Sequence, residues 1–111
     1  MKLTHEDYGH LTVLWIMGDL TADDVSLFRD TMADLMKNGI CDFVLDIRQM
    51  YSIDSQGIEA LLWLQELSAE KMGQIRLAAV QQDVETILDI TRLAVRFEQH
   101  PDVDSAIKSL R

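Results

Sequence analysis

The fold of this chain is decided by the stretch FVLDIRQMYSIDSQGI, residues 43–58. Its first five residues are apolar except for Asp46, and three of them are β-branched or aromatic, which is typical of a buried strand. A polar loop follows, and an N-capping cluster then opens a long helical pattern. The N–H groups of a first helical turn lack partners within the helix and carry partial positive charge, so an anion is best tolerated near Ser55 and Gln56. We therefore expect the functional site at this helix start.

This stretch resembles the signature of STAS domains, the anti-sigma factor antagonist family. The resemblance rests on Asp46 at the end of the strand and on residues 53–58, where the family's usual motif is aspartate-serine-serine-glycine-leucine. It extends to a strand exit at residues 18–20 and a late helix start at residues 102–106. It implies an α/β fold: a STAS-like single domain over residues 1–111, with a mixed sheet of four to five strands and about four helices mostly on one face.

The resemblance also implies a function. STAS antagonists are partner-switching proteins of bacterial transcription regulation and signal transduction, and they are not enzymes. We expect the loop and helix at residues 53–63 to bind an anti-sigma factor or a similar serine-kinase-type switch protein. In the family this kinase phosphorylates the second serine of the motif, and a serine phosphatase, in some members fused to a response regulator, removes the phosphate. Here that position is Gln56, which has no hydroxyl group. Its neutral side chain should keep the surface permanently in the unmodified, binding-competent state.

The predicted partner-binding surface combines the motif with neighbouring loop and helix positions. Its members are Asp46, Ser52, Ile53, Asp54, Ser55, Gln56, Gly57, Glu59 and Trp63. Two interpretations of the aspartates stay open. In the first, Asp54 caps the helix and Asp46 satisfies loop amides. In the second, the two carboxylates position Ser55 for the kinase and phosphatase.

Ser55 and Trp63 each have two interpretations as well. Ser55 is the remaining hydroxyl of the motif, but as its first serine it should point inward as a cap, and the charge of Glu59 one turn away would repel a phosphate. Trp63 belongs to a helix with more apolar residues than one core-facing stripe needs. Either two faces of the helix are covered, which we favour because tryptophan is largely buried on average, or Trp63 is part of the binding surface.

Composition and motifs exclude several function classes. The net charge of −9 and the pI near 4.5 argue against a nucleic-acid or anionic-membrane surface. We found no nucleotide-binding or nucleophile-elbow motif, and His5, His10 and His100 lack metal-site spacing, so we expect no enzyme activity, metal or cofactor. The single cysteine, Cys41, cannot form an internal disulfide and is interpreted as an inert core thiol.

The absence of a signal-peptide pattern and of a long apolar stretch predicts a cytoplasmic protein without membrane insertion. An alternative of another class is a fixed STAS accessory subunit of a transporter or a signalling assembly.

Hydrophobic periodicity predicts the remaining elements. It indicates a hairpin of strands at residues 3–7 and 11–16, a helix after a Thr21–Asp24 capping box, and a helix at about residues 56–71. Further along, it indicates strands at 75–80 and 94–97, a short helix at about 84–91, and a last helix capped by Asp102. This pattern predicts an α/β layer, but by itself it would also fit other small α/β folds.

Overall fold

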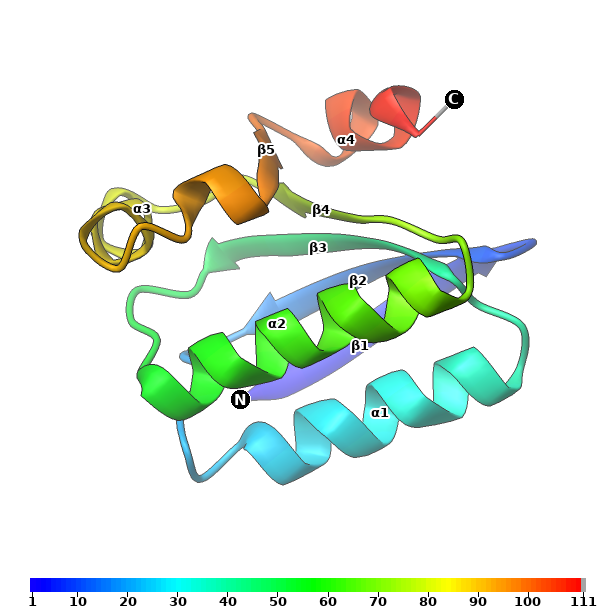
Figure 1. Ribbon diagram of the computed structural model, residues 1–111, viewed down its shortest axis with the longest axis horizontal. Coiled ribbons are helices and arrows are strands. Elements are labelled where there is room, and N and C mark those ends of the chain that lie inside the picture. The colour runs from blue at the N-terminus through cyan, green and yellow to red at the C-terminus, as the bar shows by residue number, and fades with distance from the viewer. Residues whose placement is uncertain (111) are drawn as a thin grey trace.

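The computed structural model describes residues 1–110, which form a five-stranded mixed sheet covered by helices (Figure 1). The strand order is β1-β2-β3-β4-β5, and the strands are β1 (Lys2–Tyr8), β2 (Leu11–Met17), β3 (Asp42–Gln49), β4 (Ile75–Ala78) and β5 (Glu98–His100). The pair β1–β2 is antiparallel, and each later neighbour pairs in parallel. The expected hairpin and the α/β architecture are therefore confirmed.

The helices lie mostly on one face of this sheet. They are α1 (Val25–Lys37), α2 (Ser55–Glu70), α3 (Gln82–Ile90), α4 (Val103–Ser109) and a 3-10 turn, η1 (Ala94–Arg96). Figure 1 shows α1 and α2 side by side across the sheet, with their N-terminal ends at the same edge. Helices α1, α2 and α3 pack on the larger apolar cluster, and α4 packs on a smaller cluster formed by the opposite face.

The alternation of side chains along β3 explains this two-sided burial. Phe43, Leu45 and Ile47 belong to the larger cluster, and Val44 belongs to the smaller one. All four are at most 1% exposed. Because successive side chains of a strand point to opposite faces, a strand covered on both faces is apolar at nearly every position, and Asp46 is the exception in this one. This is why the sequence 43–47 marks the centre of the fold.

The predicted capping box before α1 is wrong. The helix begins at Val25, and its N-cap residue, Asp24, makes no side-chain capping bond. The Asp24 amide instead donates to the Thr21 carbonyl at 2.9 Å, and the Thr21 hydroxyl donates to the Asp24 carboxylate at 3.4 Å. These two bonds hold residues 21–24 in a turn, so the helix starts one turn later than predicted.

The predicted strand at residues 94–97 is also wrong. Residues 94–96 form η1, and the fifth strand follows at 98–100. Arg92 adopts a left-handed backbone with φ of 61°, and the Leu93 amide donates to the Leu88 carbonyl, which folds the chain back after α3. Val95 is then 92% exposed and Phe97 is buried. The segment 94–97 therefore forms no strand, and Phe97 is its one buried residue.

Other boundaries differ by smaller amounts. Helix α2 spans residues 55–70 where 56–71 was predicted, and β4 ends at Ala78 because Ala79 has a positive φ of 56°. The N-cap at Asp102 is present, since its carboxylate accepts from the Ser105 amide at 2.8 Å. Among the helices of residues 1–110, none is long and apolar enough to cross a bilayer.

Candidate functional site

The start of α2 is held by two loops that bind each other. The β2–α1 loop and the β3–α2 loop meet in a parallel bridge between Leu20 and Ile53. Asp19, in the first loop, accepts hydrogen bonds from the amides of Tyr51 and Ser52, at 2.9 and 3.0 Å. The carboxylate therefore satisfies two N–H groups of the second loop, which is otherwise irregular.

Asp54, in the second loop, in turn binds the first loop through its carboxylate. One carboxylate oxygen accepts from the Gly57 amide at 2.8 Å, which makes Asp54 the N-cap of α2. The other oxygen accepts from the Ala22 amide at 2.9 Å. Hydrogen bonds from the Gly57 and Ala22 amides stabilise the ionised form, and they lower the pKa of the Asp54 carboxyl below its usual value. Both carboxylate oxygens are thus used in structure, as the first interpretation of Asp54 required.

Gly57 allows the first turn of α2 to lie directly against the β2–α1 loop. A Cβ atom at this position would fall 2.2 Å from the Leu20 carbonyl oxygen and 2.7 Å from the Ile53 side chain. These distances are far below van der Waals contact, so a side chain would push the helix away from the loop. Here glycine is required by close backbone approach, since its φ is not positive.

Among the predicted partner-binding residues, the exposed ones are Ser52, Ser55, Gln56 and Glu59. The expectation that Ser55 points inward as a cap is wrong. Asp54 occupies the N-cap position, so Ser55 is the first helical residue and its side chain is exposed. Gln56 is exposed in the same turn and carries no charge, and Glu59 lies one turn further along the helix.

Asp46 lies away from this surface. Alternation along β3 places it on the face of Val44, opposite to α2, and it is 2% exposed. Its carboxylate accepts from the Arg48 amide at 3.1 Å and forms an ion pair with the Arg48 guanidinium at 3.1 Å. Arg48 belongs to β3, so Asp46 lies within the strand and not at its end. The amide that its carboxylate satisfies is a strand amide, and the expected role in satisfying loop amides is wrong. The hydrogen bonds of this carboxylate go to Arg48, so the structure does not bring Asp46 and Ser55 together.

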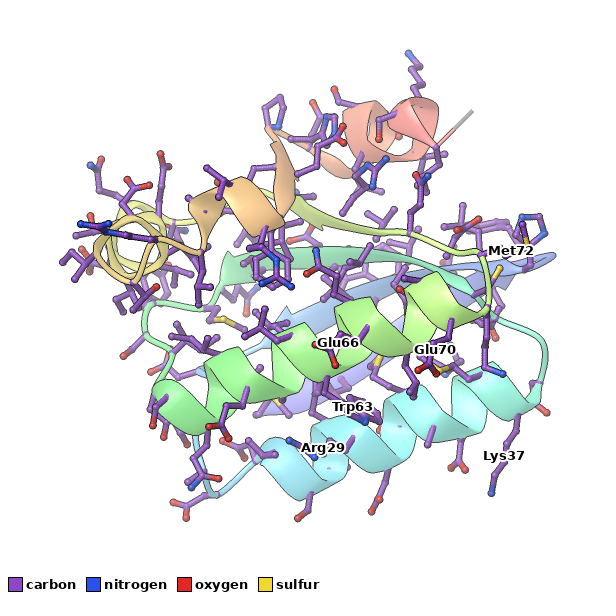
Figure 2. All side chains as sticks on the ribbon, viewed as in Figure 1. Arg29, Lys37, Trp63, Glu66, Glu70 and Met72 are labelled. Carbon is purple, nitrogen blue, oxygen red and sulfur yellow. The ribbon has the colours of Figure 1, made fainter. Side chains whose placement is uncertain are left out.

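Trp63 packs in the seam between α1 and α2 (Figure 2). It is partly buried against the larger core cluster, and the Arg29 guanidinium from α1 lies 5.4 Å from the centre of its ring. Helix α2 is therefore covered by the sheet and by α1, which accounts for its excess of apolar residues. Spacing of three and four residues places the exposed edge of Trp63 on the same side of α2 as Gln56 and Glu59.

Comparison with known proteins identifies the family. A family model described as STAS domain matches residues 2–106. The chain belongs to the STAS domain family. No curated protein matches the chain in sequence.

Several solved structures share this fold at low sequence identity. A Thermotoga maritima protein, proposed to be an anti-sigma factor antagonist, superposes with a TM-score of 0.91 at 18% identity, covering 98% of this chain and 94% of that one. The anti-sigma factor antagonist SpoIIAA in its unphosphorylated form gives 0.76 at 12% identity, covering 97% and 96%. A sulfate transporter family protein from Wolinella succinogenes gives 0.79 at 17% identity, covering 91% and 84%.

Sequence reasoning missed the role of Asp19 in this STAS domain. The sequence Gly18-Asp19-Leu20 indicates a strand exit, but nothing in its spacing indicates that Asp19 binds amides more than 30 residues away. The sequence does contain one signal: the loop after β2 and the loop after β3 each contain an aspartate, Asp19 and Asp54, and each leads into a helix. In a parallel pair such as β2–β3, both loops emerge at the same edge of the sheet.

Proposed function

We propose that this STAS domain is an anti-sigma factor antagonist that binds an anti-sigma factor of the serine-kinase type through residues 53–63. The observation that supports this most directly is Gln56, exposed and uncharged in the first turn of α2. This is the position at which the family motif has its phosphorylated serine. The related SpoIIAA is known in unphosphorylated and phosphorylated forms.

The chemistry of glutamine determines what kind of antagonist this is. A phosphate on the family serine adds about −1.5 to −2 charges at the partner surface. Glutamine cannot accept this phosphate and does not mimic it, so the surface stays neutral at this position. The proposed protein is therefore permanently competent to bind, and its activity is set by its abundance instead of by a kinase and a phosphatase. The proposal is one of binding, without catalysis.

Ser55 is a weaker candidate for a remaining phosphorylation site. Its exposed side chain is accessible to a kinase, which the expected inward orientation would have prevented. The exposed carboxylate of Glu59 still lies one turn away and opposes a second negative charge. Kinase incubation of the protein as it stands, compared with Ser55→Ala, tests this site by phosphate incorporation.

Pull-down with variants at position 56 tests the antagonist proposal. The unchanged protein and Gln56→Ser should both capture the anti-sigma factor from native cells, and Gln56→Glu should lose it. Gln82→Glu is the matched control, because it adds the same charge at the exposed first residue of α3. Only Gln56→Ser should incorporate phosphate at position 56 with the captured kinase. Equal capture by Gln56→Glu and the unchanged protein would contradict the proposal.

A second candidate function is a fixed accessory role in a transporter or signalling assembly. The similarity to the Wolinella succinogenes sulfate transporter family protein favours it. A fixed subunit would co-purify with a membrane transporter, and its complex would be insensitive to Gln56→Glu. Identification of the captured protein by mass spectrometry separates the two functions.

A further inference from the structure

Three side chains of types that can bind metals meet at the end of the sheet opposite to Gln56. His10 lies in the β1–β2 turn, Cys41 precedes β3, and Asp42 is the first residue of β3. Their ligand atoms all lie within 4.8 Å of one another. Within this group, His10 Nε2 lies 3.3 Å from Asp42 Oδ2. In Figure 1 the β1–β2 turn and the start of β3 lie at the C-terminal end of α2.

Backbone hydrogen bonds fix the relative position of these three residues. The His10 carbonyl accepts from the amides of both Cys41 and Asp42, at 2.9 and 3.1 Å. Gly9 provides the left-handed residue of the hairpin turn, with a φ of 63°. The three ligands therefore belong to two chain segments that are hydrogen-bonded to each other, and they need no long-range rearrangement to converge.

A neighbouring segment orients the Asp42 carboxylate. Its Oδ1 atom accepts from the Gln74 amide at 2.9 Å, which leaves Oδ2 directed to His10. Gly73 packs so closely that a Cβ atom there would lie 1.9 Å from the Cys41 carbonyl oxygen. Such outer contacts hold ligands in place in metal sites and contribute strongly to metal affinity.

We infer that His10, Cys41 and Asp42 form a binding site for a divalent metal ion of the zinc type. One thiolate, one imidazole and one carboxylate are the donor types that Zn²⁺ accepts, with the fourth tetrahedral position open to water. The ligand charges, −1 each from thiolate and carboxylate, balance the ion.

The geometry requires a small closure of the site. Tetrahedral zinc with bonds of about 2.0–2.3 Å places ligand atoms roughly 3.3–3.8 Å apart. The three ligand atoms here lie within 4.8 Å of one another, so only a small movement is needed to reach that spacing. The His10 side chain is 70% exposed and can rotate to close this gap. A metal ion binds the thiolate form of cysteine, so metal binding releases the Cys41 thiol proton to solvent.

Cobalt titration of the metal-free protein, under reducing conditions, tests this site. Co²⁺ should bind one ion per chain and give the near-ultraviolet absorption of a thiolate–cobalt bond, and Zn²⁺ should abolish this absorption by displacing the cobalt. Cys41→Ser should remove the band, and His10→Ala should weaken binding at least about tenfold. His5→Ala is the matched control, because His5 also pairs with a carboxylate of the hairpin, that of Asp7 at 2.9 Å, but has no cysteine beside it.

Two results would overturn the inference: no thiolate band with the unchanged protein, or an equal loss of affinity in His5→Ala and His10→Ala. Far-ultraviolet circular dichroism of each variant checks that it folds. Cys41→Ser should still capture the anti-sigma factor, because Gln56 lies at the other end of α2, so failure of the metal site and failure of the proposed function give different results.

Discussion

Replacing Gly57 by alanine tests the packing of α2 against the β2–α1 loop. The added Cβ would lie 2.2 Å from the Leu20 carbonyl oxygen, whereas ordinary contacts begin at 3.4 Å, so helix and loop must separate by about 1.2 Å. The Leu20–Ile53 bridge and the Asp54–Gly57 capping bond resist this separation.

The expected cost is the difference between two effects. Overpacking that shifts the backbone costs about 1–3 kcal/mol, and the stiff neighbours of Gly57 place it near the upper limit. Alanine in place of glycine within a helix returns about 1 kcal/mol. We expect Gly57→Ala to lower the free energy of unfolding by about 2 kcal/mol, which corresponds to a melting temperature lower by roughly 8 °C.

Urea denaturation followed by circular dichroism measures this cost. The matched control is Gln56→Ala, an exposed change one residue earlier, which should stay within about 0.5 kcal/mol of the unchanged protein. If Gly57→Ala were as stable as Gln56→Ala, the close approach of Leu20 and α2 would not exist in solution, and the argument for glycine at this position would fail.

Three other substitutions test individual contacts. Asp54→Asn concerns pH: the folded pKa of Asp54 is lowered, so its carboxylate stabilises the fold above about pH 4 and this contribution disappears as the pH falls through the folded pKa. Urea midpoints at pH 6 and pH 3 should therefore differ less in Asp54→Asn than in the unchanged protein, and an equal difference would refute the assignment. Asp19→Ala should accelerate hydrogen exchange of the Tyr51 and Ser52 amides at least about tenfold while β3 stays protected; unchanged protection of both amides would count against the Asp19 contacts. Arg29→Met removes a cation–π contact worth about 0.5–1 kcal/mol and also a buried Nε that has no hydrogen-bond partner within residues 1–110, so stability should change by less than about 1 kcal/mol, and a larger loss in urea denaturation would show that Arg29 has a further role.

The sequence predicts the centre of this fold better than its edges. The strand at residues 43–47 and the helix after Asp54 are marked by an apolar run and by a cap, both local signals, and both are present. The segment 94–97 has the same apolar character over fewer residues. There the left-handed Arg92 and the burial of Phe97 decide the outcome, and neither can be read from four residues.

In the candidate site, too, the features set by local sequence are predicted and the long-range contacts are not. The cap at Asp54 and the exposed position of Gln56 follow from helix geometry, whereas the inward orientation expected for Ser55 assumed the wrong N-cap residue. The partners of Asp19 and the meeting of His10 with Cys41 depend on strand order. Contacts between residues far apart in sequence are set by topology, and periodicity does not contain this information.

The reciprocal binding of Asp19 and Asp54 constrains how this surface can vary in length. Each aspartate reaches amides at fixed positions of the other loop, so inserting one residue into either loop would misalign both sets of hydrogen bonds at once. Surface loops ordinarily tolerate insertions well. These two connections can instead lengthen only by compensating changes in both. The proposed partner would therefore bind a surface whose shape is fixed by two segments of the chain together.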